Sequence, residues 1–138
     1  MKKSILWFFS LCLLACGFLT SCEKQNATNE ELIIGTWKIH SISEYIADEL
    51  KDKYYPEYDE GESFSWTFKQ NGVWIEEYNG DAVHTHHYEI EEDKLFLISN
   101  GGGVTLFKIV SIDSQKMKVR YSPEDEDNYS YVYELKKQ

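Results

Sequence analysis

Apolar and polar positions alternate with a period of two along most of the chain after residue 35. This period is typical of β-strands that bury one face, and its clearest runs are Phe64/Trp66/Phe68, Met117/Val119/Tyr121 and Tyr131/Tyr133/Leu135. Eight such segments, which we predict to be strands, cover residues 36–44, 63–69, 73–78, 82–90, 94–98, 104–112, 116–121 and 129–135. The pattern therefore predicts an all-β fold.

Short turn-forming stretches separate most of these segments. Asn71-Gly72 and Asn79-Gly80 predict tight hairpins of type I′, because both central residues of that turn need a positive φ, which Asn and Gly tolerate. Strands joined this tightly are antiparallel neighbours, since a parallel pair needs a crossover of about a dozen residues. An eight-stranded antiparallel up-and-down barrel hides the apolar faces and removes exposed edges, so we favour it over a sandwich, the remaining alternative.

Three segments depart from the alternation. Residues 28–31 have the capping-box spacing, a threonine followed three residues later by an acid, and predict a short N-terminal helix. Residues 45–62 are long and acidic, with Ile46 and Leu50 at helical spacing before Pro56, so we predict one short helix there, near the open end of the barrel. Residues 122–128 are interpreted as a solvated acidic loop.

The start of the chain has the layout of an export signal: two lysines, an apolar run from Ile5 to Leu19, then small polar residues. The run is too short for a permanent membrane span. Leu19-Thr20-Ser21-Cys22 resembles the lipobox of bacterial lipoproteins, which implies cleavage before Cys22 and a lipid on its sulfur. Cleavage before Cys16, or an ordinary signal with a coincidental cysteine, are the alternatives. We expect a signal over residues 1–21, a lipidated cysteine and tether over 22–27, and one domain over 28–138.

The cysteines and the charge limit what the domain does. Cys12, Cys16 and Cys22 all lie in the signal or at its end, which excludes disulfides, cysteine nucleophiles and thiolate metal sites from the folded part. The chain carries a net charge of −10. Such a charge disfavours nucleic acid and anionic lipid as partners. We expect the protein to attach to a membrane through the lipid on Cys22 and not through its charged surface. The expected location is the cell envelope, at the outer membrane.

Polar clusters give no sign of catalysis. His84 and His86 share one face of a predicted strand, but zinc needs further ligands, for which His40 or Glu76 would have to lie near. We interpret the histidines as an outward polar face and predict no metal. The carboxylate pairs Glu76/Glu77 and Glu89/Glu91 are expected by chance in a chain with 24 acids, and the sequence has no nucleophile elbow or phosphate-binding glycine loop. We predict no catalytic residue, no cofactor and no enzymatic activity.

Ile34-Gly35-Thr36-Trp37-Lys38 resembles the Gly-x-Trp signature of lipocalins, and more closely the Gly-Thr-Trp start of small bacterial lipocalin-like lipoproteins. The order and spacing of the later segments are also similar to that family. The resemblance implies a barrel that holds a small apolar molecule. It also implies that Trp37, preceded by Gly35, closes the barrel floor under an arginine from a late strand, here Arg120, the only arginine in the chain.

Bulky residues on the apolar face either fill such a barrel or contact its ligand. The candidates are Trp66, Phe68, Phe107, Tyr121, Tyr131 and Tyr133. Our first hypothesis is a lipid-anchored barrel that binds a small hydrophobic or amphipathic ligand. The alternative is a filled barrel that acts as a protein-interaction module, such as an inhibitor or an envelope-complex subunit, through tyrosines of the irregular segments: Tyr54, Tyr55, Tyr58 and Tyr129.

Overall fold

The computed structural model describes residues 26–126 and 128–138 and is almost entirely antiparallel β-sheet. The expected signal, Cys22 and most of the tether lie outside the described residues. The elements of the described part are, in chain order, α1 (Asn29–Ile33), β1 (Gly35–Ile46), β2 (Glu49–Tyr54), α2 (Pro56–Asp59), β3 (Phe64–Phe68), β4 (Val73–Tyr78), β5 (Asp81–Glu91), β6 (Lys94–Ile98), β7 (Val104–Ile112), β8 (Lys116–Tyr121) and β9 (Tyr129–Lys137).

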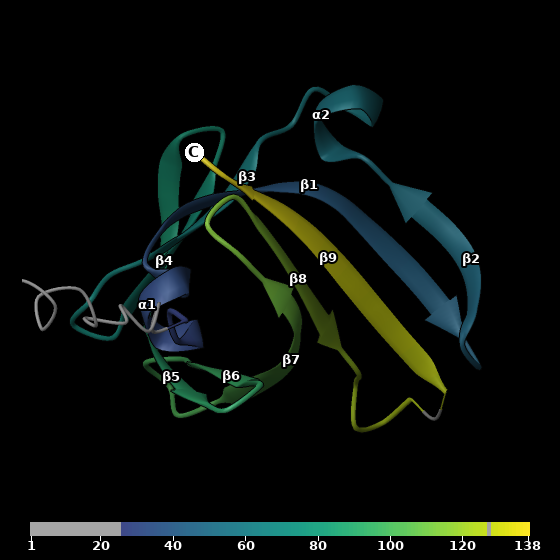
Figure 1. The fold of residues 1–138 in the computed structure, drawn as a ribbon. Coiled ribbons are helices and arrows are strands. Elements are labelled where there is room, and N and C mark those ends of the chain that lie inside the picture. Colours follow the sequence, from purple (N-terminus) through teal and green to yellow (C-terminus); the bar gives the residue numbers. More distant parts are fainter. Residues whose placement is uncertain (1–25, 127) are drawn as a thin grey trace, which may run out of the picture.

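Eight of the strands close into a barrel, as the alternation predicts. Strands β3 to β9 follow one another as antiparallel neighbours, and β1 closes the ring by pairing with β3 on one side and with β9 on the other. Strand β2 is an addition: it pairs only with the second half of β1, where β3 no longer reaches, and lies beside the barrel (Figure 1). The eight-stranded up-and-down barrel with a short N-terminal helix is thus confirmed.

Helix α1 closes one end of the barrel. Its capping box forms as the sequence predicts, because the Thr28 side chain accepts from the Glu31 amide and the Glu31 side chain accepts from the Thr28 amide. Ile33 at the end of the helix is fully buried in the barrel core, and its carbonyl accepts a hydrogen bond of 2.6 Å from Nε1 of the equally buried Trp37. The signature tryptophan therefore joins the helix to the floor of the barrel.

The partner expected for Trp37 is wrong. Nζ of Lys137, at the end of β9, lies 4.9 Å from the Trp37 ring centroid and donates to the Leu32 carbonyl at 3.0 Å. Arg120 faces outward, where it lies over the Tyr45 ring and 3.5 Å from Asp48. The reason is the period of two, since Val119 beside it is fully buried and Arg120 must point to the opposite face of β8.

Gly35 holds the position that the signature predicts for it. Its φ is +129°, which side-chain-bearing residues rarely adopt. A Cβ at this position would lie 2.7 Å from Cε of Lys137, the side chain that covers Trp37. Glycine thus lets the chain turn from α1 into β1 beneath that lysine.

Residues 45–62 differ from their predicted form. Ile46 and Leu50 do not share a helix: Ile46 ends β1, and Leu50 belongs to β2, where it lies opposite Tyr45 of β1. The chain reverses at Ala47 and Asp48, whose φ angles are +51° and +64°. Positive φ is costly for alanine, and the usual Asn-Gly pair is absent here. The sequence therefore does not indicate this hairpin. The helix of this segment is α2, four residues that begin at Pro56.

The two Asn-Gly pairs both lie in hairpins, but only one has the predicted type. Asn79 and Gly80 have φ angles of +51° and +88° and join β4 to β5 directly, as a type I′ turn requires. The connection of β3 to β4 is longer, and there only Gly72 has a positive φ, of +77°. The predicted type I′ turn at Asn71-Gly72 is wrong, because a four-residue connection closes with one left-handed residue.

Candidate functional site

The barrel is hollow at the end opposite α1. A partly open cavity of about 580 Å³ lies there, and its wall is formed by residues of β1 to β7 and of β9. Because the strands run alternately up and down, this end also carries the turns at residues 79–80 and 99–103 and the loop residues 122–126 and 128. The barrel interior is therefore not filled, contrary to the premise of the protein-interaction hypothesis.

Aromatic side chains form a large part of the cavity wall. They are Tyr54, Phe64, Trp66, Trp74, Phe107 and Tyr133. Trp66 is central to them: its ring centroid lies 5.5 Å from Phe107, 5.5 Å from Tyr133 and 6.0 Å from Trp74. Ile39, Ile42, Leu97 and Val104 complete the apolar part.

Three of the six residues that the sequence offers as ligand contacts, Trp66, Phe107 and Tyr133, line this cavity. The other three do not. Phe68 is only 1% exposed and packs below Trp66 against Tyr88, with ring centroids 5.0 Å apart. Tyr121 packs beside Phe107, and Tyr131 stacks on Tyr121.

The alternation rule missed the contribution of β4 and β5. Trp74, Glu76 and His86 line the cavity, although polar side chains are expected on the outer face of a barrel strand. The register places Trp74 opposite His86, and their rings stack at 5.4 Å. The sequence predicted an outward polar face for His86, and that prediction is wrong, because His86 lines the cavity. His84, two residues earlier, is exposed and stacks on His86 at 5.6 Å.

Two carboxylates reach the cavity, and they differ in their partners. Glu62 accepts hydrogen bonds from the hydroxyls of Tyr78, at 2.8 Å, and Tyr54, at 3.5 Å. Partial burial together with Glu60 and Glu62 raises the pKa of Tyr54 to about 12, so this tyrosine stays a neutral donor. The side chain of Glu76 makes no hydrogen bond or ion pair with any described residue, and its charge adds to burial in raising the pKa of Tyr133.

The cavity also contains buried nitrogens without partners. Nε1 of Trp66, Nε1 of Trp74 and Nδ1 of His86 make no hydrogen bond with the described residues. Since these atoms are buried, the carbon surfaces of the rings form the wall. Among these residues no group of three His, Cys, Asp or Glu side chains is arranged to hold a metal ion.

The carboxylate pairs considered from sequence do not face a common substrate. Glu76 points into the cavity, whereas Glu77 accepts from Thr67 Oγ1 at 3.1 Å on the outer face. Glu89 and Glu91 are both exposed on β5. Alternation along β4 separates Glu76 from Glu77, which are neighbours at i and i+1, whereas Glu89 and Glu91, at i and i+2, share the exposed face of β5.

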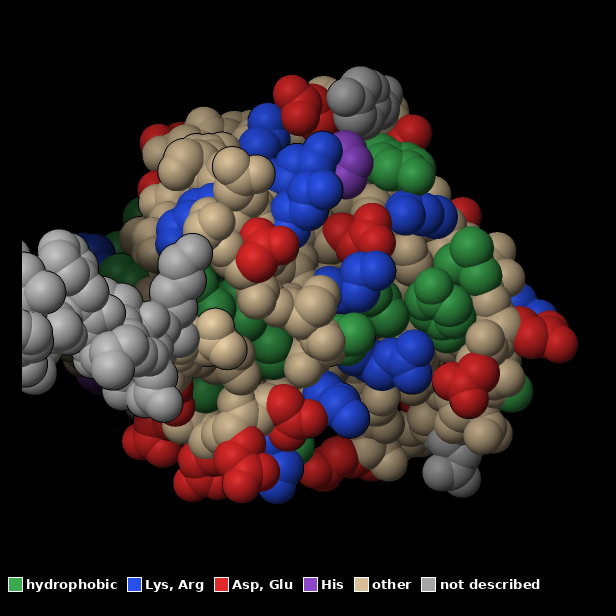
Figure 2. Space-filling model, viewed as in Figure 1, with side chains coloured by type: hydrophobic (Ala, Val, Ile, Leu, Met, Phe, Trp, Pro, Cys, Tyr) green, Lys and Arg blue, Asp and Glu red, His purple; other side chains and the backbone are tan. Residues whose placement is uncertain are grey.

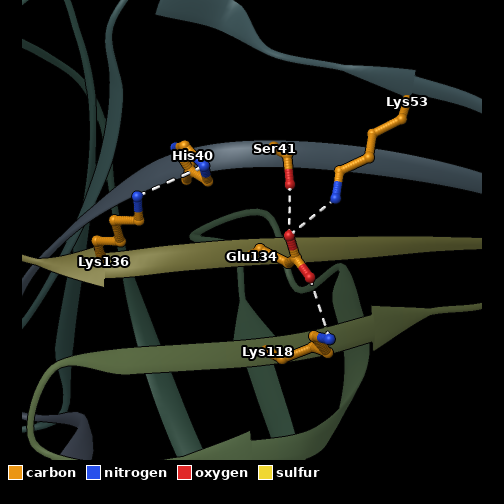
Figure 3. A network of polar contacts seen from close by, with 6 residues as sticks. All are labelled: His40, Ser41, Lys53, Lys118, Glu134 and Lys136. Atoms are coloured by element: carbon orange, nitrogen blue, oxygen red, sulfur yellow. Dashed lines mark hydrogen bonds and ion pairs between the residues drawn. The ribbon is translucent and has the colours of Figure 1, made fainter.

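A polar cluster on the outer face is fully paired. Basic side chains gather over β8 and β9 (Figure 2), and Glu134 lies among them. Glu134 accepts from Ser41 Oγ at 2.8 Å and forms ion pairs with Lys53, at 3.1 Å, and Lys118, at 3.0 Å (Figure 3). Partial burial alone would raise the pKa of Glu134, but the hydrogen bonds from Lys118, Ser41 and Lys53 outweigh it and lower the pKa to about 2. This cluster connects β1, β2, β8 and β9.

We expect Glu134→Gln to lower the free energy of unfolding by about 1 to 2 kcal/mol at pH 7, after allowance for solvent screening of two partly exposed pairs. A carboxyl whose folded pKa is depressed stabilises the fold above its unfolded pKa. The difference from the unsubstituted protein should therefore shrink as the pH falls from 4.5 to about 2. Urea unfolding at pH 7, 4.5 and 2.5 measures it, with Glu89→Gln as the exposed control. A stability difference between the variant and the unsubstituted protein that stays constant over this pH range would contradict the lowered pKa of Glu134.

A family model described as a lipocalin-like domain matches residues 33–119, more than half of the chain. The chain therefore belongs to the lipocalin-like domain family, as the Gly-Thr-Trp start implied. Members of this family are typically non-enzymatic binding proteins, and their barrel is a ligand-binding fold.

Among solved structures, the chain is similar to an uncharacterized protein from Bacteroides eggerthii DSM 20697. The similarity covers 76% of this chain and 98% of that protein, with 13% sequence identity and a TM-score of 0.38. No curated protein matches the sequence. Within residues 26–126 and 128–138, no helix is long and apolar enough to cross a bilayer.

Proposed function

We propose that this protein is a lipid-anchored, non-enzymatic binding protein that holds a small hydrophobic or amphipathic ligand in the cavity opposite α1. The cavity carries the proposal. Its volume of about 580 Å³ lies within the range of about 300 to 1,000 Å³ that is common for small-molecule sites. Its composition also fits, since a wall of aromatic and aliphatic side chains with a few polar groups is typical of such sites.

The anchor is the second part of the proposal and depends on the sequence of residues 1–22. A diacylated cysteine supplies more than one acyl chain, and each buried methylene contributes about 0.8 kcal/mol to membrane binding. Attachment then needs no membrane-binding surface on the domain. We further propose that the anchored protein lies in the cell envelope, at the outer membrane.

The ligand is tested by isolating the full chain from its native host in lipid nanodiscs. Native mass spectrometry should show a complex heavier than the lipidated protein by one small molecule, and organic extraction of the sample should release that molecule. A matched preparation of Leu97→Trp, which places a large ring in the cavity wall, should retain much less of it. Recovery of both proteins without any small molecule, and with a stoichiometric protein partner, would favour the interaction module instead.

The anchor is tested on the same material. The intact mass of the isolated protein should exceed that of residues 22–138 by at least a diacylglyceryl group in thioether linkage to Cys22, and labelled palmitate fed to the cells should be incorporated. Cys22→Ser should abolish the label. A polypeptide that retains Met1, or that begins at Cys22 with a free thiol, would contradict lipid attachment.

A further inference from the structure

The charge of the cavity is one-sided. Of the described residues that line it, Glu62 and Glu76 are acidic and none is lysine or arginine. Glu62 is held by two tyrosine hydroxyls, but the carboxylate of Glu76 has no hydrogen bond or ion pair with any described residue. A partly buried carboxylate without a partner has lost water and gained nothing in exchange. A ligand that supplies the missing positive charge recovers that loss.

The wall around Glu76 suits a cation as well. Glu76 lies opposite Trp66 in the β3–β4 register and lines the same cavity as Tyr133, whose pKa is raised first by burial and then by the charge of Glu76. Since the indole nitrogens of Trp66 and Trp74 are buried, these residues present ring surface to the cavity. The face of an aromatic ring attracts a cation within about 6 Å of its centroid, most strongly for tryptophan.

The turns and loops around the open end of the cavity are also negatively charged. The described residues of the turns and of the long loop at this end, 47–48, 79–80, 99–103 and 122–126, contain no lysine or arginine, and the loop carries Glu124, Asp125 and Glu126. The whole chain has a net charge of −10. Such a field concentrates cations near the mouth and repels anions.

We propose that the ligand of this cavity is a cationic amphiphile: an alkyl or aryl chain with a protonated amine. The proposal deepens the proposed function and rests on it. The ammonium group lies beside the Glu76 carboxylate and donates hydrogen bonds to it, against the ring surfaces of Trp66 and Trp74. The apolar chain extends along Ile39, Ile42 and Leu97. An amphiphile with a carboxylate or sulfate head meets two negative charges and no positive one.

The test compares three probes with the same eight-carbon chain: octylammonium, 1-octanol and octanoate. The full lipidated protein in nanodiscs is titrated with each at pH 7 and low salt, with empty nanodiscs as the blank. Binding is followed through the change in tryptophan fluorescence, because two of the tryptophans, Trp66 and Trp74, line the cavity and Trp37 does not. Octylammonium should bind at least about tenfold more tightly than octanoate, with octanol between them. The advantage of octylammonium should decrease in 0.5 M salt, because screening weakens a partly exposed charge pair.

The variant Glu76→Gln assigns the preference to its residue. It should weaken octylammonium binding by about threefold to tenfold, strengthen octanoate binding, and leave octanol binding unchanged. Glu77→Gln is the matched control, because Glu77 is the next residue of β4 and points to the outer face. It removes the same charge from the same strand and should leave the order of the probes unaltered.

The failures of the two proposals are distinguishable. If none of the three probes binds, the ligand-binding function itself is wrong. If octanol or octanoate binds as tightly as octylammonium, the barrel binds amphiphiles but the cationic class is wrong. If Glu76→Gln and Glu77→Gln reduce octylammonium binding equally, only the overall charge matters and the proposed pairing with Glu76 is overturned.

Discussion

Replacing Trp37 with alanine is expected to lower the free energy of unfolding by about 3 to 5 kcal/mol. The side chain is fully buried, and its removal leaves a large void between α1 and the barrel floor. It also leaves the Ile33 carbonyl without its 2.6 Å hydrogen bond and removes the ring that lies under Lys137. Urea unfolding at pH 7, followed by circular dichroism, measures the change.

Trp37→Phe separates packing from hydrogen bonding. Phenylalanine keeps most of the buried ring but lacks the N–H donor, so we expect a smaller loss of about 1 to 3 kcal/mol, in the range of a buried acceptor left unpaired. If alanine and phenylalanine destabilise the protein equally, the hydrogen bond to α1 dominates over packing. If neither does, the closed end is not held by this residue.

Phe68→Ala is expected to cost about 3 to 5 kcal/mol of stability. The sequence pattern presents Phe68 as a ligand contact, but the structure places it beneath the cavity, 1% exposed and packed on Tyr88. Truncation therefore empties part of the core. Tyr121→Ala, at a half-buried position on the same inward face, should cost less than half as much. The measurement is urea unfolding of both variants, together with ligand retention.

The two assignments of Phe68 give different results. A core residue lowers stability strongly, and any loss of ligand follows from unfolding. If Phe68→Ala were as stable as the unsubstituted protein and yet lost the ligand, the residue would belong to the binding surface and the position assigned to the cavity floor would be wrong.

The barrel itself was predictable because one rule applies nearly everywhere along the chain. Short strands with one apolar face and tight connections have few ways to bury that face, and eight of them close into a ring. The N-terminal helix was equally accessible, since Thr28 and Glu31 give a local signal that depends on nothing distant. Strand β2 was not, because its turn rests on left-handed Ala47 and Asp48, which carry no turn signal strong enough to oppose the helical spacing of Ile46 and Leu50.

The site was only half predictable. Trp66, Phe107 and Tyr133 follow from alternation, but the pattern does not tell which inward side chain lies at the hollow end and which at the packed end, so Phe68 and Tyr121 were included with them. Glu76 and His86 break the polar-outside rule, and only the pairing of β4 with β5 shows where they point. The basic partner of Trp37 is Lys137 and not Arg120, and here the alternation was right. It already placed Arg120 on the outer face of β8, but the expectation from the family was followed instead.

The position of α1 bears on how a ligand would come and go. The helix begins at Asn29 and covers the packed end, where the Asn29 side chain donates to the Glu92 carbonyl. Six residues, 22–27, span at most about 20 Å. If a lipid on residue 22 anchors the chain, the end of the barrel that α1 closes lies next to the bilayer, and the open end of the cavity faces the aqueous compartment. Cargo would then be exchanged with water or with a carrier across that compartment, and not taken directly from the leaflet that holds the protein.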